Sequence, residues 1–288
     1  MSPVLKNQDG VYFYNMCGRY TLVSKIEVIE KRFQAKANFS QYSNPNISAA
    51  DLAPVITSGN PQTICLMHFG MQPPWATKSM LLLNARSEGD HNPENSTLYH
   101  GALGIIQKPA FRKPIRQQRC LVLADAFIEG PEAQRLQQPY LVYPNERESP
   151  FAFAGIWECW QDLKSGEIRN GFAIITGPAM PVVASFKHHR SPIVLPQGEE
   201  HTWLDPDLPL AEVTALLKAP AELHWNTYPI STAIKQAANK SLDLLQPVGP
   251  PLLPELSFVF SQKLQLSGMG ASPARTRRAA DNDQLSLF

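Results

Sequence analysis

The chain has 288 residues, of which 26 are Lys or Arg, 25 are Asp or Glu, and 43% are hydrophobic. This nearly neutral and ordinary composition excludes disordered, collagen-like and membrane-embedded classes of protein. The first fifteen residues lack the basic start and apolar centre of a signal peptide, and no apolar run approaches the roughly 18 residues of a membrane span. We therefore expect a cytoplasmic protein with no membrane partner.

Short apolar runs separated by proline dominate the first two-thirds of the chain, which has 26 prolines in all. This pattern predicts many short strands joined by irregular loops. Two stretches have helical spacing: Ser24-x-x-Glu27 is a capping box that would open one helix, and Leu210–Lys218 repeats Leu and Val at helical intervals. We therefore predict an α+β fold with a strand-dominated core. The predicted strands are Cys17–Val23, Thr63–Gly70, Cys120–Ile128, Tyr140–Tyr143, Phe151–Trp157 and Phe172–Thr176.

Composition divides the chain into three parts. Residues 1–15 form an extension without a strong helix or strand pattern, residues 16–265 form one domain, and residues 266–288 form a flexible tail rich in small and polar residues. No coiled-coil pattern or swapped element is evident, so we expect a monomer.

The four cysteines, Cys17, Cys65, Cys120 and Cys159, lie far apart and form no C-x-x-C pair. This spacing argues against a zinc knuckle and against a dense disulfide framework. No glycine-rich phosphate loop or cluster of metal ligands accompanies them. We therefore expect neither a metal nor a cofactor.

Cys17 directly follows a second methionine, Met16. If translation starts at Met16, or if the chain is cut after it, Cys17 becomes the amino terminus. An N-terminal cysteine has an α-amine with a pKa of about 8 and a thiol with a pKa of about 8.5, so both are partly deprotonated near neutrality. Such an aminothiol condenses with an aldehyde and closes to a thiazolidine. The alternative is an ordinary core thiol at the start of a strand.

Three further polar groups lie at the ends of apolar runs, where binding and catalytic sites are often built. Asn84 follows Leu81–Leu83, Glu129 ends the apolar stretch that starts at Cys120, and His188 precedes the apolar run Ile193–Leu195. A carboxylate in apolar surroundings and an imidazole both transfer protons near neutral pH. The alternatives are a turn asparagine, a solvated glutamate and a packing or surface histidine. A metal site at the adjacent histidines is disfavoured, because neighbouring side chains of an extended segment point to opposite sides.

A basic stretch carries five positive charges and no acid between Lys108 and Arg119. With Phe111 and nearby Trp75 available to stack on bases, and with Arg112 among the cations, the stretch is a candidate footprint for single-stranded DNA. A solvated basic loop is the alternative interpretation.

Taken together and in this order, these segments resemble the SRAP family, the SOS response-associated peptidases whose members protect abasic sites in single-stranded DNA. The resemblance runs from about residue 16 to about residue 250, and the combination is specific although each motif is weak alone. The matching segments are Met16–Tyr20, Asn46-Ile47, Gly70–Ala76, Asn84–Glu88, Phe111-Arg112, Arg119–Glu129, Ala154–Trp157 and His188-x-Arg190-Ser191-Pro192.

The resemblance implies a β-rich single domain with a barrel-like sheet, peripheral helices and a groove for single-stranded DNA with Cys17 at its floor. By analogy, the α-amine of Cys17 attacks the open-chain aldehyde of an abasic deoxyribose, and the thiolate closes a thiazolidine that crosslinks protein and DNA. By motif position Asn84 orients the amine, Glu129 acts as acid and base, and His188 assists opening of the sugar ring.

The resemblance also implies residues that hold the DNA. Arg19 and Arg86 contact flanking phosphates, and Arg190 joins the DNA-binding set by its motif position. Residues 1–15 remain to be explained, because Cys17 is an internal amide in the chain as written. Either Met16 is the true start, which we favour, or the family's self-processing peptidase activity removes the segment.

The last five residues carry a separate signal. Gln284-Leu285-Ser286-Leu287-Phe288 looks like the sliding-clamp-binding peptide of bacterial replication and repair proteins. Leu287 and Phe288 would fill an apolar pocket on the clamp, Leu285 matches the motif, and Gln284 would hydrogen-bond at the pocket rim. The tail would then bring the domain to replication forks on the nucleoid.

The sequence leaves three functional hypotheses open. The first is an enzyme of the DNA damage response that crosslinks itself to abasic sites and processes its own N-terminus. The second is a thiol peptidase or amidohydrolase with Cys17 as nucleophile and His188 as base. The third is a non-covalent binder of single-stranded DNA that acts as a clamp-tethered shield.

Overall fold

The structure is a computed structural model that describes residues 5–6, 12–13, 18–76, 80–144, 149–162, 165–218 and 224–253. Its strands are β1 (Leu5–Lys6), β2 (Tyr12–Phe13), β3 (Arg19–Leu22), β4 (Lys36–Ala37), β5 (Asn44–Ile47), β6 (Leu52–Thr57), β7 (Asn60–Phe69), β8 (Met80–Leu81), β9 (Asn84–Arg86), β10 (Arg119–Ala124), β11 (Ala126–Glu129), β12 (Tyr140–Pro144), β13 (Phe151–Gln161), β14 (Ile168–Pro178), β15 (Arg190–Pro192) and β16 (Trp225–Pro229). Its helices are α1 (Ile26–Phe33), α2 (Pro114–Gln117), α3 (Pro181–Ala184), α4 (Glu200–Leu204) and α5 (Leu210–Leu216), with 3₁₀ turns η1 (Gly104–Ile106), η2 (Arg135–Gln137), η4 (Thr232–Lys235) and η5 (Leu242–Leu245).

The larger sheet closes on itself. Antiparallel pairing runs from β14 through β13, β10 and β6 to β7, and β7 then returns to β14 in parallel. The closure depends on Gly171 in β14, because a Cβ there would lie 2.4 Å from the carbonyl oxygen of Gly70. The predicted α+β class with a barrel-like sheet is confirmed.

A second sheet, in the order β16-β12-β11-β3-β5, continues from the first. The sequence predicted one strand over Cys120–Ile128, and this was wrong in one respect, because the run breaks at Asp125 into β10 and β11. The buried Asp125 carboxylate accepts hydrogen bonds from the backbone N–H groups of Val23 and Ser24 at 2.7 and 2.8 Å. Burial raises the pKa of Asp125, and these hydrogen bonds partly oppose it. The break sends β11 into the second sheet beside β3.

The predicted capping box at Ser24 is wrong, although the helix predicted from it is present as α1. The N-cap of α1 is Lys25, without a side-chain cap, and Ser24 instead donates its hydroxyl to Asp125 Oδ1 at 2.6 Å. The tertiary partner therefore displaces the local one. The second predicted helix is confirmed as α5. A strand prediction for the apolar run Ile193–Leu195 is wrong in position, because the strand after His188 is β15 at Arg190–Pro192.

Aromatic side chains fill the barrel and the seam between the two sheets. Tyr20 packs edge-on to Phe69 and Phe153, with ring centroids 5.5 and 5.9 Å apart. Phe69 also stacks on Phe172 at 5.3 Å. Each such ring, fully buried, stabilises the fold by about 1.5–3 kcal/mol through apolar burial. The core thus fixes the start of β3. In the sequence, Cys17 comes two positions before the first residue of this strand.

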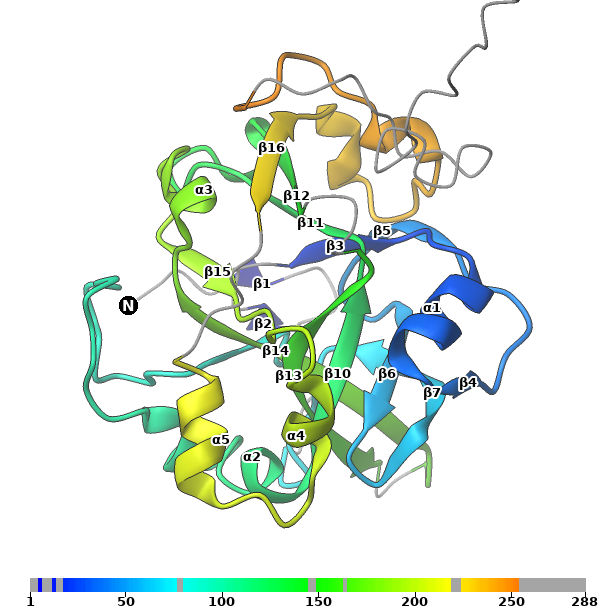
Figure 1. The fold of residues 1–288 in the computed structure, drawn as a ribbon, viewed down its shortest axis with the longest axis vertical. Coiled ribbons are helices and arrows are strands. Elements are labelled where there is room, and N and C mark those ends of the chain that lie inside the picture. The colour runs from blue at the N-terminus through cyan, green and yellow to red at the C-terminus, as the bar shows by residue number, and fades with distance from the viewer. Residues whose placement is uncertain are drawn as a thin grey trace, which may run out of the picture.

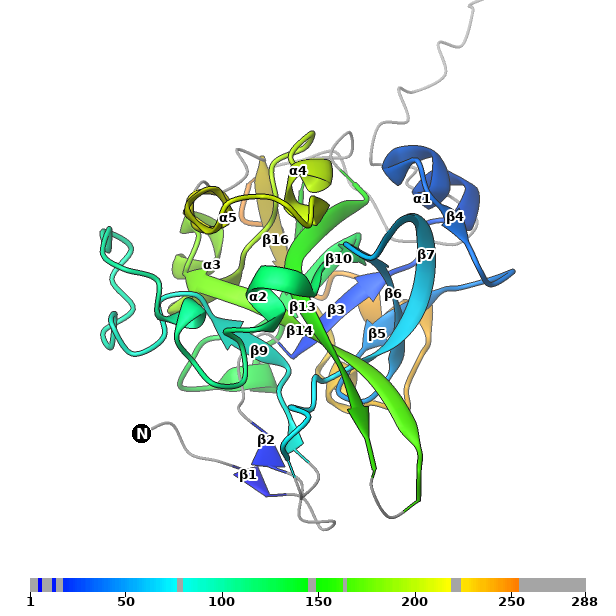
Figure 2. The same cartoon turned by 90° about the horizontal axis from the view of Figure 1, so that it is seen from below.

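Helices cover the outside of the barrel. Figures 1 and 2 show α2, α4 and α5 gathered at one end of it, with α1 on the flank beside β6 and β7. Within residues 1–15, β1 pairs antiparallel with β2, and β2 pairs in parallel with β8. In the part of the chain that the structure describes, no helix has the length and apolar character to cross a membrane.

Candidate functional site

Glu129 and His188 form an acid–base pair at the end of β11. Glu129 is the last residue of β11, and His188 lies between α3 and β15. Glu129 Oε1 lies 3.4 Å from His188 Nε2, and the two side chains are 11% and 7% exposed. These residues are 59 positions apart in the sequence, which predicted no partner for either of them. The fold brings them together.

The backbone sets the orientation of the His188 ring. Nδ1 lies 2.8 Å from the carbonyl oxygen of Arg190. A carbonyl can only accept, so Nδ1 carries the proton, and a longer approach of the Arg190 N–H to the same nitrogen at 3.3 Å is secondary. Nε2 then faces Glu129 Oε1. This geometry suits transfer of a proton to or from a third group.

Gly18 lies beside Glu129 and near Leu83, the residue before Asn84. In the pairing of β3 with β11, Arg19 is opposite Ile128, so Gly18 and Glu129 follow at the same end of the strand pair. A Cβ on Gly18 would lie 3.7 Å from Cδ1 of Leu83, the residue before Asn84. Asn84 itself is half-buried at the start of β9. Cys17 precedes Gly18 in the sequence but lies outside the described residues.

Arg190 is enclosed. Its side chain is 0% exposed, and it donates to both oxygens of Glu88 at 2.9 and 3.0 Å, to Asn95 at 3.1 Å and to the Thr176 carbonyl at 2.8 Å. This placement contradicts the expectation that Arg190 contacts DNA, because its donors are turned into the protein. Since Arg190 also supplies the carbonyl that orients His188, its position in the structure is that of a positioning residue.

Glu88 ties Arg190 to Arg86. Burial alone raises the pKa of the Glu88 carboxyl, but the hydrogen bonds and charge of Arg190 outweigh burial and hold that pKa below its usual value. Arg86 Nε lies 3.9 Å from Glu88 Oε2, and the Arg86 side chain is 26% exposed. Nε and Nη2 of Arg86 have no hydrogen-bond partner in the described structure. Burial, followed by the charge of Arg190, lowers the pKa of Arg86. Two donors of Arg86 are thus buried without a hydrogen-bond partner among the described residues.

Arg19 is held by Asn46. Its guanidinium donates to Asn46 Oδ1 at 2.6 Å and to the Lys235 carbonyl at 2.8 Å. Burial lowers the pKa of Arg19, and Asp51 opposes that effect. Asn46 in turn donates to three carbonyls in the segment 234–239. Arg19 is therefore fixed next to the start of β3.

The remaining predicted DNA contacts lie on the surface. Trp75 is 57% exposed, Phe111 is half-buried against the core, and Arg112 is exposed in the turn before α2. The predicted clamp-binding residues Gln284, Leu285, Leu287 and Phe288 lie outside the described residues.

Sequence reasoning missed the roles of Glu88 and Asn46. Both lie inside the sequence motifs described above. The sequence predicts no partner for either, because the pairing of Glu88 with Arg190 spans 102 positions. The only signal was their type, because a carboxylate and an amide need partners when they are buried. No cluster of three or more His, Cys, Asp or Glu side chains arranged for a metal occurs among the described residues.

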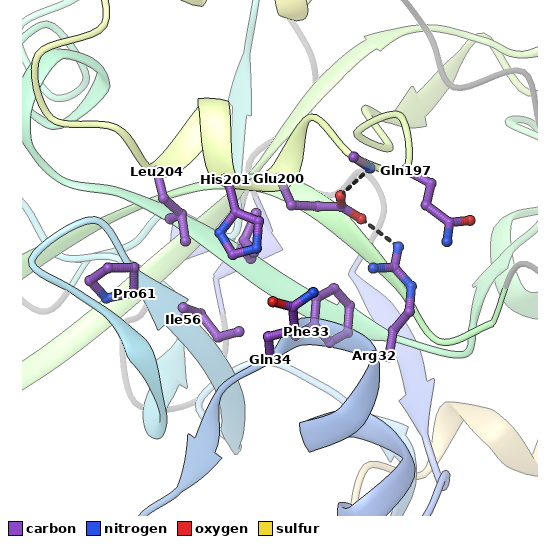
Figure 3. A pocket seen from close by; sticks show the side chains of 11 residues that line it. Arg32, Phe33, Gln34, Ile56, Pro61, Gln197, Glu200, His201 and Leu204 are labelled. Carbon is purple, nitrogen blue, oxygen red and sulfur yellow. Dashed lines mark hydrogen bonds and ion pairs between the residues drawn. The ribbon is translucent and has the colours of Figure 1, made fainter.

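An enclosed cavity lies elsewhere. It has a volume of about 200 Å³ and sits between α1, the β6–β7 hairpin, β10 and α4, with Arg32, Gln34, His201 and Glu200 among its lining residues (Figure 3). Its dashed ion pair joins Arg32 to Glu200 at 2.5 Å. None of the predicted site residues lines this cavity.

Comparison with known proteins identifies the family of this chain. Residues 16–237 match the profile of the family described as SOS response associated peptidase (SRAP). The chain belongs to the SRAP family. Its start at residue 16 agrees with the motif at Met16 and Cys17, so the resemblance inferred from the motifs is confirmed.

Several relatives of this SRAP chain are curated as abasic site processing proteins. YoaM of Bacillus subtilis (strain 168) is 26% identical over 238 residues, which cover 80% of this chain and 97% of the relative. HMCES of Gallus gallus is 31% identical over 189 residues, which cover 58% of this chain and 55% of the relative.

Solved structures show the same fold. A crystal structure of a protein from Bacteroides thetaiotaomicron superimposes with a TM-score of 0.66 at 24% identity and covers 81% of this chain and all of its own. A second, from Bordetella bronchiseptica, has a TM-score of 0.58 at 21% identity, covering 75% of this chain. These likenesses concern the fold.

Proposed function

We propose that this SRAP protein captures abasic sites in single-stranded DNA through a thiazolidine formed by an N-terminal Cys17. The observation that carries the proposal is the Glu129–His188 pair at 3.4 Å, beside the start of the strand that follows Cys17. The family match and the names of the curated relatives support the same substrate.

The reaction proceeds in two steps. The α-amine nitrogen of Cys17 adds to the aldehyde carbon of the ring-opened abasic sugar, losing a proton to the Glu129 carboxylate. The resulting hydroxyl takes up a proton and leaves as water, which gives an imine. The Cys17 sulfur then adds to the imine carbon, and its proton passes to the nitrogen, which closes the thiazolidine. The product weighs the sum of both reactants less one water.

The surrounding residues have separate tasks in this proposal. Asn84, one residue from the Leu83 side chain that Gly18 contacts, orients the amine. His188 passes a proton to the sugar oxygen during ring opening, since its Nε2 faces Glu129. Arg86 and Arg19 hold phosphates next to the lesion, and Trp75 and Phe111 stack on bases.

The chemistry requires a free amine, so residues 1–16 must be absent from the active protein. Either translation begins at Met16 and the methionine is removed, or the protein hydrolyses its own Met16–Cys17 peptide bond with one water. The second route makes it an autoprocessing cysteine peptidase as well as a crosslinking enzyme.

The C-terminal residues add a protein partner to this proposal. Gln284–Phe288 binds the apolar pocket of the DNA polymerase sliding clamp and brings the domain to replication forks on the nucleoid. Deleting residues 284–288 should abolish binding to the clamp and leave capture of abasic oligonucleotides unchanged. Equal clamp binding by the truncated chain would reject this part of the proposal.

The test is the intact mass of the purified full-length protein before and after incubation with a uracil-containing oligonucleotide treated with uracil glycosylase. We expect a starting mass that begins at Cys17 and an added mass equal to the oligonucleotide less one water. Cys17→Ala should give no adduct, whereas Cys159→Ala, at an exposed free cysteine, should behave as the wild type.

Two outcomes would favour the other hypotheses. An adduct that survives in Cys17→Ala would reject thiazolidine chemistry. Absence of any adduct, with hydrolysis of peptide or amide substrates that depends on Cys17, would identify a thiol hydrolase. Absence of both, with intact DNA affinity, would identify a non-covalent shield.

A further inference from the structure

An open groove with a volume of about 570 Å³ lies along α2, outside the candidate site. Its lining residues are Ile106, Gln107, Arg112, Lys113, Arg116 and Gln117. Figure 2 shows α2 at the end of the barrel, facing the viewer. Three of the six lining residues are cationic, and none is acidic or aromatic.

The fold sorts the five cations of this basic stretch into two groups. Arg119 is buried and donates to four backbone carbonyls, those of Ile115, Arg116, Trp203 and Asp205. Lys108 pairs with Asp90. These two charges are therefore committed to the protein itself, and neither lines the groove.

The other three cations face the groove without a carboxylate. Arg116 donates to the carbonyl oxygens of Ile106, at 3.0 Å, and Arg112. The exposed side chains of Arg112 and Lys113 form no ion pair with any described residue. Elsewhere on the surface, cations such as Lys36, Arg169 and Lys240 pair with a neighbouring acid. The groove is thus an unneutralised concentration of positive charge.

The clustering of these charges suits a polyanion. Arg116 lies in α2 and Arg112 in the turn before it, and the two residues are close because the Arg116 guanidinium donates to the Arg112 carbonyl oxygen. Guanidinium groups bind phosphate oxygens through paired donors. Without an aromatic ring, the groove has nothing on which a base can stack.

We propose that the α2 groove binds the phosphate backbone of the DNA at a distance from the abasic nucleotide. The inference rests on the proposed function for the identity of the polyanion. The groove is physically linked to the site through η1, whose Gly104 and Ile105 donate to the carbonyl oxygens of Glu88 and Ser87 at 3.1 and 3.0 Å. It binds by charge and reads no sequence.

The experiment compares the double variant Arg112→Gln/Lys113→Gln with the wild type. Anisotropy of a labelled single-stranded oligonucleotide without an abasic site gives affinity at salt concentrations from about 50 to about 300 mM. We expect affinity at low salt to fall about five-fold or more, because two exposed charge contacts of about 0.5 kcal/mol each are lost. The slope of log affinity against log salt should decrease in size by about 1.4, at about 0.7 for each lost contact with a single strand.

A matched control removes the same charge elsewhere. Lys25→Gln/Lys31→Gln changes two exposed lysines on and before α1 and should keep the affinity and salt slope of the wild type. Wild-type affinity and slope in the groove variant, or equal losses in the control, would overturn the groove proposal. Failure of Cys17 to form an adduct, with the expected loss in the groove variant, would instead reject the proposed function and leave the groove standing.

Discussion

Two partly buried acid–base pairs lie in different regions of this molecule, and they differ in what they can do. Glu129, at the end of β11, and His188, just before β15, meet at 3.4 Å. Arg32 and Glu200 meet at 2.5 Å between α1 and α4, beside the enclosed cavity of Figure 3. If a lining cavity were the only criterion, the second of these two regions would be taken as the site.

The proton-transfer chemistry of the two pairs favours the first region instead. An imidazole gains and loses a proton near neutral pH, whereas a guanidinium stays charged throughout the physiological range. The Glu129–His188 pair can therefore hand a proton to a substrate, and the Arg32–Glu200 pair holds two elements together. The motif residues Gly18 and Arg190 lie next to the first pair, and none of the predicted site residues lines the cavity. A cavity indicates where a ligand would fit, and only the residues around it indicate what reaction could follow.

The largest effect that separates the two regions is expected at Glu129. Glu129→Gln keeps the shape of the side chain but cannot take a proton from the Cys17 amine. We expect the rate of adduct formation with abasic DNA to fall about 100-fold or more, in the range typical for loss of a general acid or base. Quenched time courses resolved by mass measure the rate.

Glu132 offers a matched control for that variant. It is a neighbouring glutamate that contacts a neighbouring histidine, His189, at 2.7 Å, but its side chain is 63% exposed. Glu132→Gln should therefore react at the wild-type rate. A similar loss in both variants would mean that negative charge in this region matters, and not proton transfer at Glu129.

The next effect concerns stability. Glu88→Gln leaves the Arg190 guanidinium charged and unpaired in the interior, which typically costs about 3–5 kcal/mol. Urea denaturation should show this loss of unfolding free energy. Glu167→Gln, which breaks the exposed pair with Arg169, should change it by about 0–1 kcal/mol. Comparable changes in unfolding free energy in the two variants would show that the Glu88–Arg190 pair behaves like a solvent-exposed ion pair despite its burial.

The same pair predicts a pH dependence. The pKa of Glu88 is lower in the folded protein than its ordinary value of 4.5, so the folded state favours the carboxylate. The stabilisation is present above 4.5 and is lost as the pH falls through the lowered value of the folded state. The difference in unfolding free energy between the wild type and Glu88→Gln should shrink below pH 4.5; a difference that is constant from neutral pH to acid would contradict the assignment. Asp125 has the opposite sign, because burial raises its pKa, so the comparison with the variant is needed to isolate Glu88.

Much of this arrangement could be predicted from the sequence, because it depends on local patterns. Strand positions such as Phe151–Trp157 follow from β-branched and aromatic runs, and the structure extends that strand to Gln161. Glu129 and His188 could be nominated by chemical type at the ends of apolar runs. What no local pattern contains is their proximity, since it arises from the closure of the barrel and from the break at Asp125.

The errors have the same origin. Ser24 matches a capping box, but Asp125, 101 positions away, competes for its hydroxyl and prevails. Arg190 stands in a basic motif that suggests DNA contact, but Glu88 draws its guanidinium inward. In both cases a buried carboxylate from a distant segment decides the role of a polar side chain, and single-sequence reasoning has no means to pair them.

The smallest effect is expected in the region with the cavity. Arg32→Gln removes one partner of a pair in which the Arg32 side chain is 20% exposed, and Glu200 keeps its hydrogen bond from the Gly198 N–H at 2.6 Å. We therefore expect a loss of only about 1 kcal/mol in unfolding free energy and no change in the rate of adduct formation. His201→Ala, at an exposed lining residue, should change neither quantity. A slower reaction in either variant, at unchanged stability, would mean that the cavity takes part in capture and that the two regions act together.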